Sequence, residues 1–180
     1  LAAVDGYWGE PAAIKTIRIK VVPNFTSQIL NLQSGQTDLM VTGVPLKTLP
    51  SLLEKGFELH QMVNPDRTQV FLNERTPAFA TAEGRTAIAA AIDRDAIVNS
   101  VYGEYGTVAE HIWTTEGLPG DAGRYQVEYD PESAKAFVET LPEADRSLTF
   151  QYVNDTPEQQ TCALQIGAAL DAVGLKVEVV

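Results

Sequence analysis

The residue types that most often bind metals or attack substrates are few and far apart in this sequence. Its single cysteine is Cys162, and its two histidines are His60 and His111. A zinc site needs several cysteine, histidine or carboxylate ligands at short, characteristic spacings, and these three residues do not have them. The sequence therefore predicts no metal site, and one thiol cannot form an internal disulfide.

Candidates for acid–base, nucleophilic or phosphate-binding chemistry are also weak. Asp93 and Asp95 lie on a predicted helix at a spacing that points them to different sides, and no serine lies in a nucleophile-elbow context. Gly103 and Gly106 follow a helix rather than a strand, which is typical of a helix end and not of a phosphate-binding loop. We therefore predict that the chain is not an enzyme and has no cofactor.

Composition and charge exclude further classes of function. The chain of 180 residues has 24 acidic against 13 basic residues and a formal net charge of −11, which disfavours binding to nucleic acid. A hydrophobic content of 44% is typical of a folded chain. Residues 1–68 contain equal numbers of acidic and basic residues, so the whole excess of negative charge lies in residues 69–180. Two segments of different composition are therefore joined near residue 68.

Hydrophobic periodicity predicts the elements that must position any site. In the first segment, strands and helices alternate, which favours an α/β layer with a largely parallel sheet. Predicted strands are 16–22, 37–41 and 57–63, and predicted helices run from Asn24 to Gly35 and from Leu46 to Gly56.

In the second segment, a strand at 68–72 precedes an irregular stretch around Pro77, which marks the best boundary between domains. Capping residues and apolar stripes then predict further elements. They are a helical region at 83–102 with a second start at Asp93, a long loop at 103–129, a helix starting at Asp130, a strand at 147–153, a helix from Thr156 to Gly174 and a strand at 175–180.

A series of short motifs lies along almost the whole chain in a fixed order. They are Tyr7-Trp8-Gly9, residues 32–39, Phe71-Leu72-Asn73 followed by Pro77, Arg85, residues 90–98, Val101-Tyr102-Gly103, residues 129–135 and residues 170–177. Each motif alone is weak, but together their order and spacing resemble the family 5 extracellular solute-binding proteins of ABC importers. This group includes dipeptide-, oligopeptide- and nickel-binding proteins.

The resemblance implies an α/β, type II periplasmic-binding-protein-like fold with two lobes, each a mixed sheet with flanking helices. It implies that the chain is a central, incomplete part of a longer protein. Residues 1–68 would be the returning part of the first lobe, 69–73 a strand that crosses at the hinge, and 74–180 the opening part of the second lobe. A secretory signal or lipid anchor is expected outside this range.

The resemblance also implies which residues border the ligand. These are Val41, Thr42, Gly43, Gln69, Phe71 and Trp113. Val41 and Phe71 lie in alternating segments, where such residues more often belong to a hydrophobic core, and this alternative stays open. Thr42 and Gly43 are small, which argues against a conventional clamp on a peptide backbone and leaves room for a bulkier ligand.

The function implied is that of an extracytoplasmic, monomeric binding component of an ABC importer, periplasmic or lipid-anchored at the outer face of the membrane. It would capture a small molecule or peptide by hinge closure and deliver it to an ABC permease. Peptides are the first expectation, with nickel complexes and oligosaccharides as alternatives. Two other classes stay open: a fragment of an α/β enzyme, and a ligand-sensing module, with functional residues outside this range.

Overall fold

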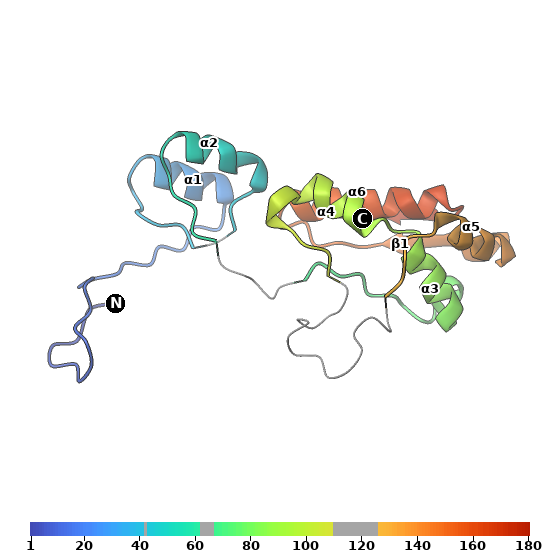
Figure 1. The fold of residues 1–180 in the computed structure, drawn as a ribbon, viewed down its shortest axis with the longest axis horizontal. Helices are drawn as coiled ribbons and strands as arrows, with labels where there is room; N and C mark the ends of the chain where they lie inside the picture. The colour runs from blue at the N-terminus through green and yellow to red at the C-terminus, as the bar shows by residue number, and fades with distance from the viewer. Residues whose placement is uncertain (42, 62–66, 110–125) are drawn as a thin grey trace. The chain divides into compact units, whose positions relative to one another are not determined.

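The computed structural model describes residues 1–41, 43–61, 67–109 and 126–180 (Figure 1). The chain divides into two compact units, Leu1–Val44 and Pro45–Val180. Each unit is described separately below, from the local signals that start and end its elements.

The unit Leu1–Val44 contains a paired N-terminal loop and one helix. Leu1 and Ile17 exchange two hydrogen bonds of 2.7 and 2.9 Å, and Ala2 and Thr16 form an isolated antiparallel bridge. The helix α1 spans Phe25–Gln33, and the Asn24 side chain accepts a hydrogen bond from its first turn. The predicted helix between Asn24 and Gly35 is therefore confirmed, because both its signals are local.

Four of the predicted strands are wrong for the described residues. Apart from the bridge at Thr16, residues 17–22, 37–41, 57–61 and 68–72 form no strand. A strand needs a ladder of N–H and C=O groups on a neighbouring strand, and apart from the two hydrogen bonds of Ile17 with Leu1 the described residues form no such ladder with these segments. Several of their apolar side chains stay exposed, with Ile19 at 76% and Val21 at 87%, whereas Leu72 packs against the hydrophobic cluster. The predicted mixed sheet in each lobe is replaced by one two-stranded parallel sheet among the described residues.

The unit Pro45–Val180 begins with a short helical stretch. A 3-10 turn, η1 (Leu46–Thr48), leads directly into α2 (Leu49–Glu54), which has Pro50 in its first turn. Leu49 and Leu52 are buried, and Gly56 at φ 84° follows the helix end. This agrees with the predicted helix from Leu46 to Gly56.

Two consecutive helices follow the irregular stretch around Pro77. After the 3-10 turn η2 (Pro77–Phe79) come α3 (Ala82–Ala90) and α4 (Arg94–Val101), and a further turn, η3 (Gly103–Tyr105), comes after α4. The predicted interruption at Asp93 is confirmed, since its side chain accepts a 2.8 Å hydrogen bond from the N–H of Ala96.

The C-terminal part of this unit is a β-α-β arrangement preceded by a helix. Its elements are α5 (Pro131–Thr140), η6 (Glu143–Arg146), β1 (Ser147–Phe150), α6 (Pro157–Ala172) and β2 (Lys176–Val179). The strands pair in parallel, with Leu148 opposite Val177. Asp130 and Thr156 cap α5 and α6 as predicted. Both strands form at the predicted places but are shorter than predicted.

One hydrophobic cluster joins these elements, and Figure 1 shows α5 and α6 lying along the sheet. Val138 of α5 and Ile88 of α3 are the largest side chains that are fully buried. A Cβ atom at Gly84 would lie 2.4 Å from the carbonyl oxygen of Ala78 and 2.8 Å from the Phe137 ring. Glycine at this position therefore lets α3 approach both η2 and α5.

Two leucines on α6 provide a matched test of this packing. Leu170 is 4% exposed in the core, whereas Leu164 is 54% exposed. We expect Leu170→Ala to lower the free energy of unfolding by about 2–5 kcal/mol, because it leaves a cavity. Leu164→Ala should change it by less than about 1 kcal/mol. Urea denaturation measures both, and equal losses would contradict the described orientation of α6.

Candidate functional site

The six residues predicted to border a ligand are distributed over both units. Thr42 and Trp113 lie outside the described residues. Val41 and Gly43 belong to the unit Leu1–Val44, and Gln69 and Phe71 belong to the unit Pro45–Val180. Among the four described residues, Gln69 and Phe71 share one short segment, as their spacing in the sequence requires.

Val41 and Gly43 are both exposed. Val41 has 88% of its surface accessible, so the described residues give it no place in a hydrophobic core. A Cβ atom built on Gly43 would have no neighbour within 4 Å, and Gly43 has no positive φ angle. Neither packing nor backbone conformation therefore requires glycine at this position in the described structure.

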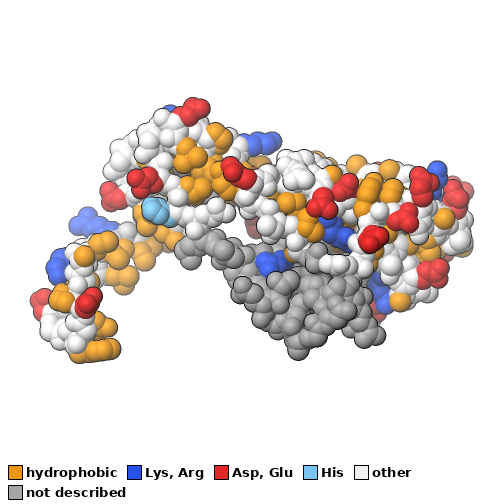
Figure 2. Space-filling model, viewed as in Figure 1, with side chains coloured by type: hydrophobic (Ala, Val, Ile, Leu, Met, Phe, Trp, Pro, Cys, Tyr) orange, Lys and Arg blue, Asp and Glu red, His pale blue; other side chains and the backbone are white. Residues whose placement is uncertain are grey.

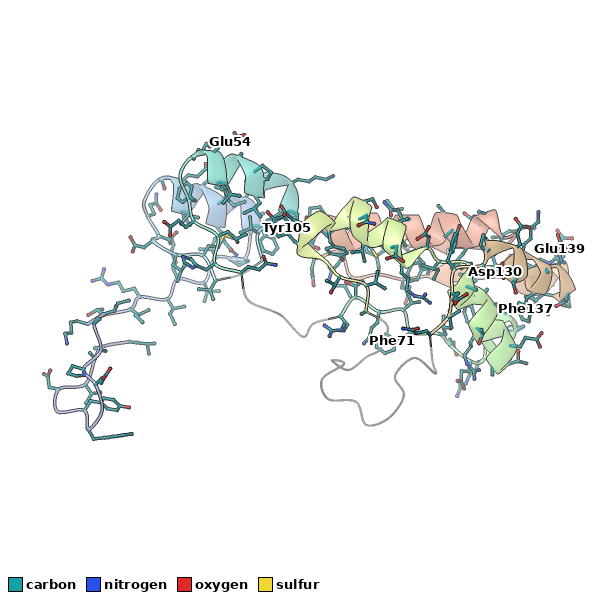
Figure 3. The ribbon with its side chains drawn as sticks, viewed as in Figure 1. Glu54, Phe71, Tyr105, Asp130, Phe137 and Glu139 are labelled. Atoms are coloured by element: carbon teal, nitrogen blue, oxygen red, sulfur yellow. The ribbon has the colours of Figure 1, made fainter. Side chains whose placement is uncertain are left out.

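Gln69 and Phe71 lie on an extended segment that leads toward η2. Successive side chains of an extended chain point to opposite sides. Leu72 packs against the hydrophobic cluster of the unit, whereas the neighbouring Phe71 is 84% exposed (Figure 3). Gln69, two residues before Phe71, is exposed as well. Phe71 is thus not a core residue among the described residues, and an amide and an aromatic ring are available on the outer face of the segment.

The end of this segment is fixed by local hydrogen bonds. The side-chain oxygen of Asn73 accepts a 3.1 Å hydrogen bond from the N–H of Arg75, and the Asn73 carbonyl accepts one of 2.9 Å from Thr76. Asparagine commonly has this role in irregular chain, where its side chain satisfies nearby backbone groups. Arg85 donates to the carbonyl of Phe79 at 3.0 Å, and so holds the following turn in place.

The matched residues between α3 and α4 also have structural roles. Arg94 donates hydrogen bonds to the carbonyls of Val127, at 2.8 Å, and Ala89, at 3.3 Å. The N–H of Asp130 donates to the carbonyl of Ala90 at 2.9 Å. The chain that enters α5 is therefore attached where α3 ends, as expected for motifs that specify the fold.

The titratable residues do not form a catalytic or metal-binding cluster in the part of the chain that the structure describes. No group of three or more histidine, cysteine, aspartate or glutamate side chains there could hold a metal ion. Cys162 is 5% exposed in α6, and its burial raises the pKa of the thiol. His60 is exposed, 3.6 Å from the Glu58 carboxylate. Among these residues, no helix is long and apolar enough to cross a membrane.

Acidic side chains are spread over the visible face of the unit Pro45–Val180 rather than gathered into one patch (Figure 2). No charged residue is buried among the described residues. The excess of negative charge in the described part of this unit therefore lies on its surface, in contact with solvent.

A polar contact joins distant parts of this unit without any signal in the sequence. The Glu158 carboxylate, in the first turn of α6, accepts a 2.8 Å hydrogen bond from the N–H of Leu46. One carboxylate thus lies at the N-terminal ends of two helical elements, where unpaired N–H groups favour negative charge. It borders a small pocket that Lys47, Ser100, Val101, Pro157 and Thr161 also line. The partners are 112 residues apart, so no local pattern could have indicated the contact.

Comparison with known proteins identifies the family of the chain. The model of the bacterial extracellular solute-binding proteins, family 5 Middle, matches residues 1–180. The chain belongs to this family. It is a family of solute-binding proteins and not of enzymes, so the predicted family and the predicted lack of enzymatic activity are confirmed.

Among curated proteins, the chain is similar to two from Escherichia coli K12. It is 28% identical over 138 residues to the dipeptide-binding protein, covering 76% of this chain and 25% of that protein. It is 30% identical over 149 residues to the nickel-binding periplasmic protein, covering 77% and 28%. The chain thus spans about a quarter to a third of the length of the curated relatives it matches.

Solved structures show the same fold. NikA from Brucella suis, in complex with Fe(III)-EDTA, matches with a TM-score of 0.79 and 21% identity over 97% of this chain and 39% of NikA. DppA from Helicobacter pylori, in complex with the peptide STSA, matches with a TM-score of 0.71 and 20% identity over 99% of this chain and 35% of DppA. The family member described here therefore has the fold of part of a periplasmic binding protein, mostly helical and with a small parallel sheet.

The contrast between Asp93 and Asp95 tests whether these aspartates are structural. Asp93 caps α4, while Asp95 is an exposed residue of its first turn. We expect Asp93→Ala to lower the free energy of unfolding by about 1 kcal/mol because the N–H of Ala96 loses its acceptor. Asp95→Ala should cost less, about 0.3–1 kcal/mol through the helix dipole. Thermal and urea unfolding check both, and an Asp93→Ala variant as stable as the parent would refute the capping role.

Proposed function

We propose that this chain is the central part of the extracytoplasmic substrate-binding component of an ABC importer, with peptide as its ligand. The observation that carries the proposal is the match of the family model to residues 1–180. Its specific support is the similarity to a dipeptide-binding protein and to a probable D,D-dipeptide-binding periplasmic protein, both from Escherichia coli K12. The same proposal includes a monomeric protein that is either periplasmic or lipid-anchored at the outer face of the membrane.

The proposed mechanism is capture between two lobes. In it, residues 1–68 belong to the first lobe, 69–73 cross at the hinge, and 74–180 belong to the second lobe. A ligand that contacts both lobes binds the closed form more tightly than the open form, and so shifts the population toward closure. The closed, loaded protein is then the form that an ABC permease receives. The anchoring of Leu72 in the core beside the exposed Phe71 supports a crossing segment fixed to the second lobe.

The proposed ligand contacts are Val41, Thr42, Gly43, Gln69, Phe71 and Trp113. Phe71 offers an apolar ring, and covering an exposed aromatic side chain contributes roughly 1.5–3 kcal/mol. The Gln69 amide can both donate to and accept from a peptide backbone. Neither side chain packs in the hydrophobic core, so both are accessible to a ligand.

Metal complexes are the second candidate ligand class. The nickel-binding periplasmic protein of Escherichia coli and the heme-binding protein A of Haemophilus influenzae are each 30% identical to this chain over the matched residues. Oligosaccharides remain a further alternative from the sequence. An exposed phenylalanine and a glutamine fit a peptide, an apolar macrocycle or a chelated metal, so the ligand has to be identified directly.

Mass spectrometry of small molecules that co-purify with the full-length protein tests the proposal. We expect short peptides in stoichiometric amounts. The isolated 180-residue chain should carry none, because part of a cleft cannot bury the roughly 70–90% of a ligand's surface that binding sites enclose. Recovery of heme or a nickel complex would contradict the peptide assignment, and tight binding by the isolated chain would contradict the divided site.

The neighbours Phe71 and Leu72 allow a matched test of the crossing segment. In the full-length protein, Phe71→Ala should weaken affinity for the co-purified peptide about tenfold, equivalent to about 1.4 kcal/mol, with little change in melting temperature. Leu72→Ala should lower the melting temperature because it removes a core contact. Calorimetry of binding and of unfolding measures both quantities. If Phe71→Ala loses stability and affinity equally, the ring has a packing role instead.

A further inference from the structure

The extended segment before Asn73 is held from one side at two points. The side-chain hydroxyl of Thr68 and the hydroxyl of Tyr102 lie 3.2 Å apart, within hydrogen-bonding distance. Leu72 packs against the hydrophobic cluster. Because Leu72 follows Thr68 by four positions, an even offset, the two lie on the same face of an extended chain. The opposite face then presents Gln69 and Phe71.

Exposure along the segment agrees with this alternation. Val70, on the face of the two anchors, is 36% exposed, whereas Phe71 is 84% exposed. A slip of one residue would exchange the faces, turning the Phe71 position inward and the Leu72 position outward. No neighbouring strand among the described residues pairs with this segment. Contacts of its own side chains must therefore decide which residues face the core and which face outward.

Tyr102 is itself held firmly. It follows α4 directly, and its N–H donates a 2.8 Å hydrogen bond to the carbonyl of Val98. The chain then turns at Gly103, where φ is 55°, and returns so closely that a Cβ atom at Gly106 would lie 2.4 Å from the Cβ of Tyr102. Gly106 thus packs against the Cβ of Tyr102. This contact restricts the orientation of the tyrosine ring, and its hydroxyl reaches Thr68.

We propose that Tyr102 is a positioning residue for ligand binding. Through its hydrogen bond with Thr68 it fixes the register of residues 68–72, so that Gln69 and Phe71 face outward. This inference rests on the proposed function, in which Gln69 and Phe71 border the ligand. Tyr102 does not contact the ligand in this scheme, and its effect on affinity passes entirely through the segment that it holds.

A nearby tyrosine provides a matched control. Loss of hydration and the adjacent Glu104 carboxylate raise the pKa of Tyr105, whereas the hydroxyl that lies within hydrogen-bonding distance of Thr68 is that of Tyr102. Tyr102→Phe and Tyr105→Phe each remove one hydroxyl and leave the ring in place. A difference between them therefore reports the contact with Thr68 rather than a general loss of polarity in this loop.

The register is tested without ligand by a nitroxide spin label on a Phe71→Cys variant of the full-length protein. Cys162 is 5% exposed and its raised pKa slows its reaction, so labelling favours position 71; other accessible cysteines are replaced. Tyr102→Phe and Thr68→Val should each raise label mobility about twofold or more, while Tyr105→Phe and Thr68→Ser leave it unchanged. Identical spectra for Tyr102→Phe and its parent would overturn the inference.

Affinity for the tripeptide Ala-Ala-Ala is measured on the same variants with Phe71 restored. Tyr102→Phe should weaken binding by about two- to tenfold, the range expected for one hydrogen bond, without lowering the melting temperature. Adding Thr68→Val should cause no further loss, since both changes remove one interaction. Tyr105→Phe should bind like the parent, and a loss as large as that of Tyr102→Phe would count against the inference.

The two arms separate the possible failures. If the parent does not bind the peptide but the label responds to Tyr102→Phe, the proposed peptide ligand is wrong and the fixed register stands. If the parent binds and Phe71→Ala weakens binding while Tyr102→Phe alters neither label nor affinity, the positioning role is wrong and the proposed function stands.

Discussion

The packing of α6 onto the two-stranded sheet is the interaction on which the rest of the unit Pro45–Val180 depends. A Cβ atom at Gly167 would lie 2.6 Å from a methyl group of Val179, so the glycine lets the helix approach β2 closely. Ile166 and Leu170 of α6 then reach the same cluster as Val138 of α5. The helices α3 and α4 and the segment at Leu72 contact this cluster and take their positions from it, because a closely packed core admits few alternative arrangements.

This arrangement gives the two faces of the segment at residues 68–72 different surroundings. Leu72 is tied to the core, and the adjacent Phe71 is thereby left on the outer face. In an extended chain the two cannot be exchanged without moving the backbone. A side chain that is exposed because its neighbour is buried is available for binding at no cost to the core. The alternation of side chains along an extended chain, which buries Leu72, can thus also provide a ligand contact in a binding protein of this family.

Helices could be predicted from the sequence far better than strands. Asn24, Asp93, Asp130 and Thr156 each accept a hydrogen bond from the first turn that they were expected to cap. A cap acts within a few residues, so its signal is complete in the local sequence. The alternating stretch at 17–22 has a strand pattern and yet forms none in the described structure, because alternation states which sides are apolar but supplies no partner for the backbone.

The sequence by itself determined the family, through motifs whose order and spacing survive at low identity, and the limits of most helices, through caps and glycines. Tertiary structure alone decided that Val41 and Phe71 are exposed rather than buried, since both readings fit the same alternation. It also decided the contacts of Tyr102 with Thr68 and of Glu158 with Leu46, whose partners are 34 and 112 residues apart. The physical reason is that local patterns record the chain's preferences over a few residues, whereas exposure and distant hydrogen bonds exist only once the core has brought separate segments together.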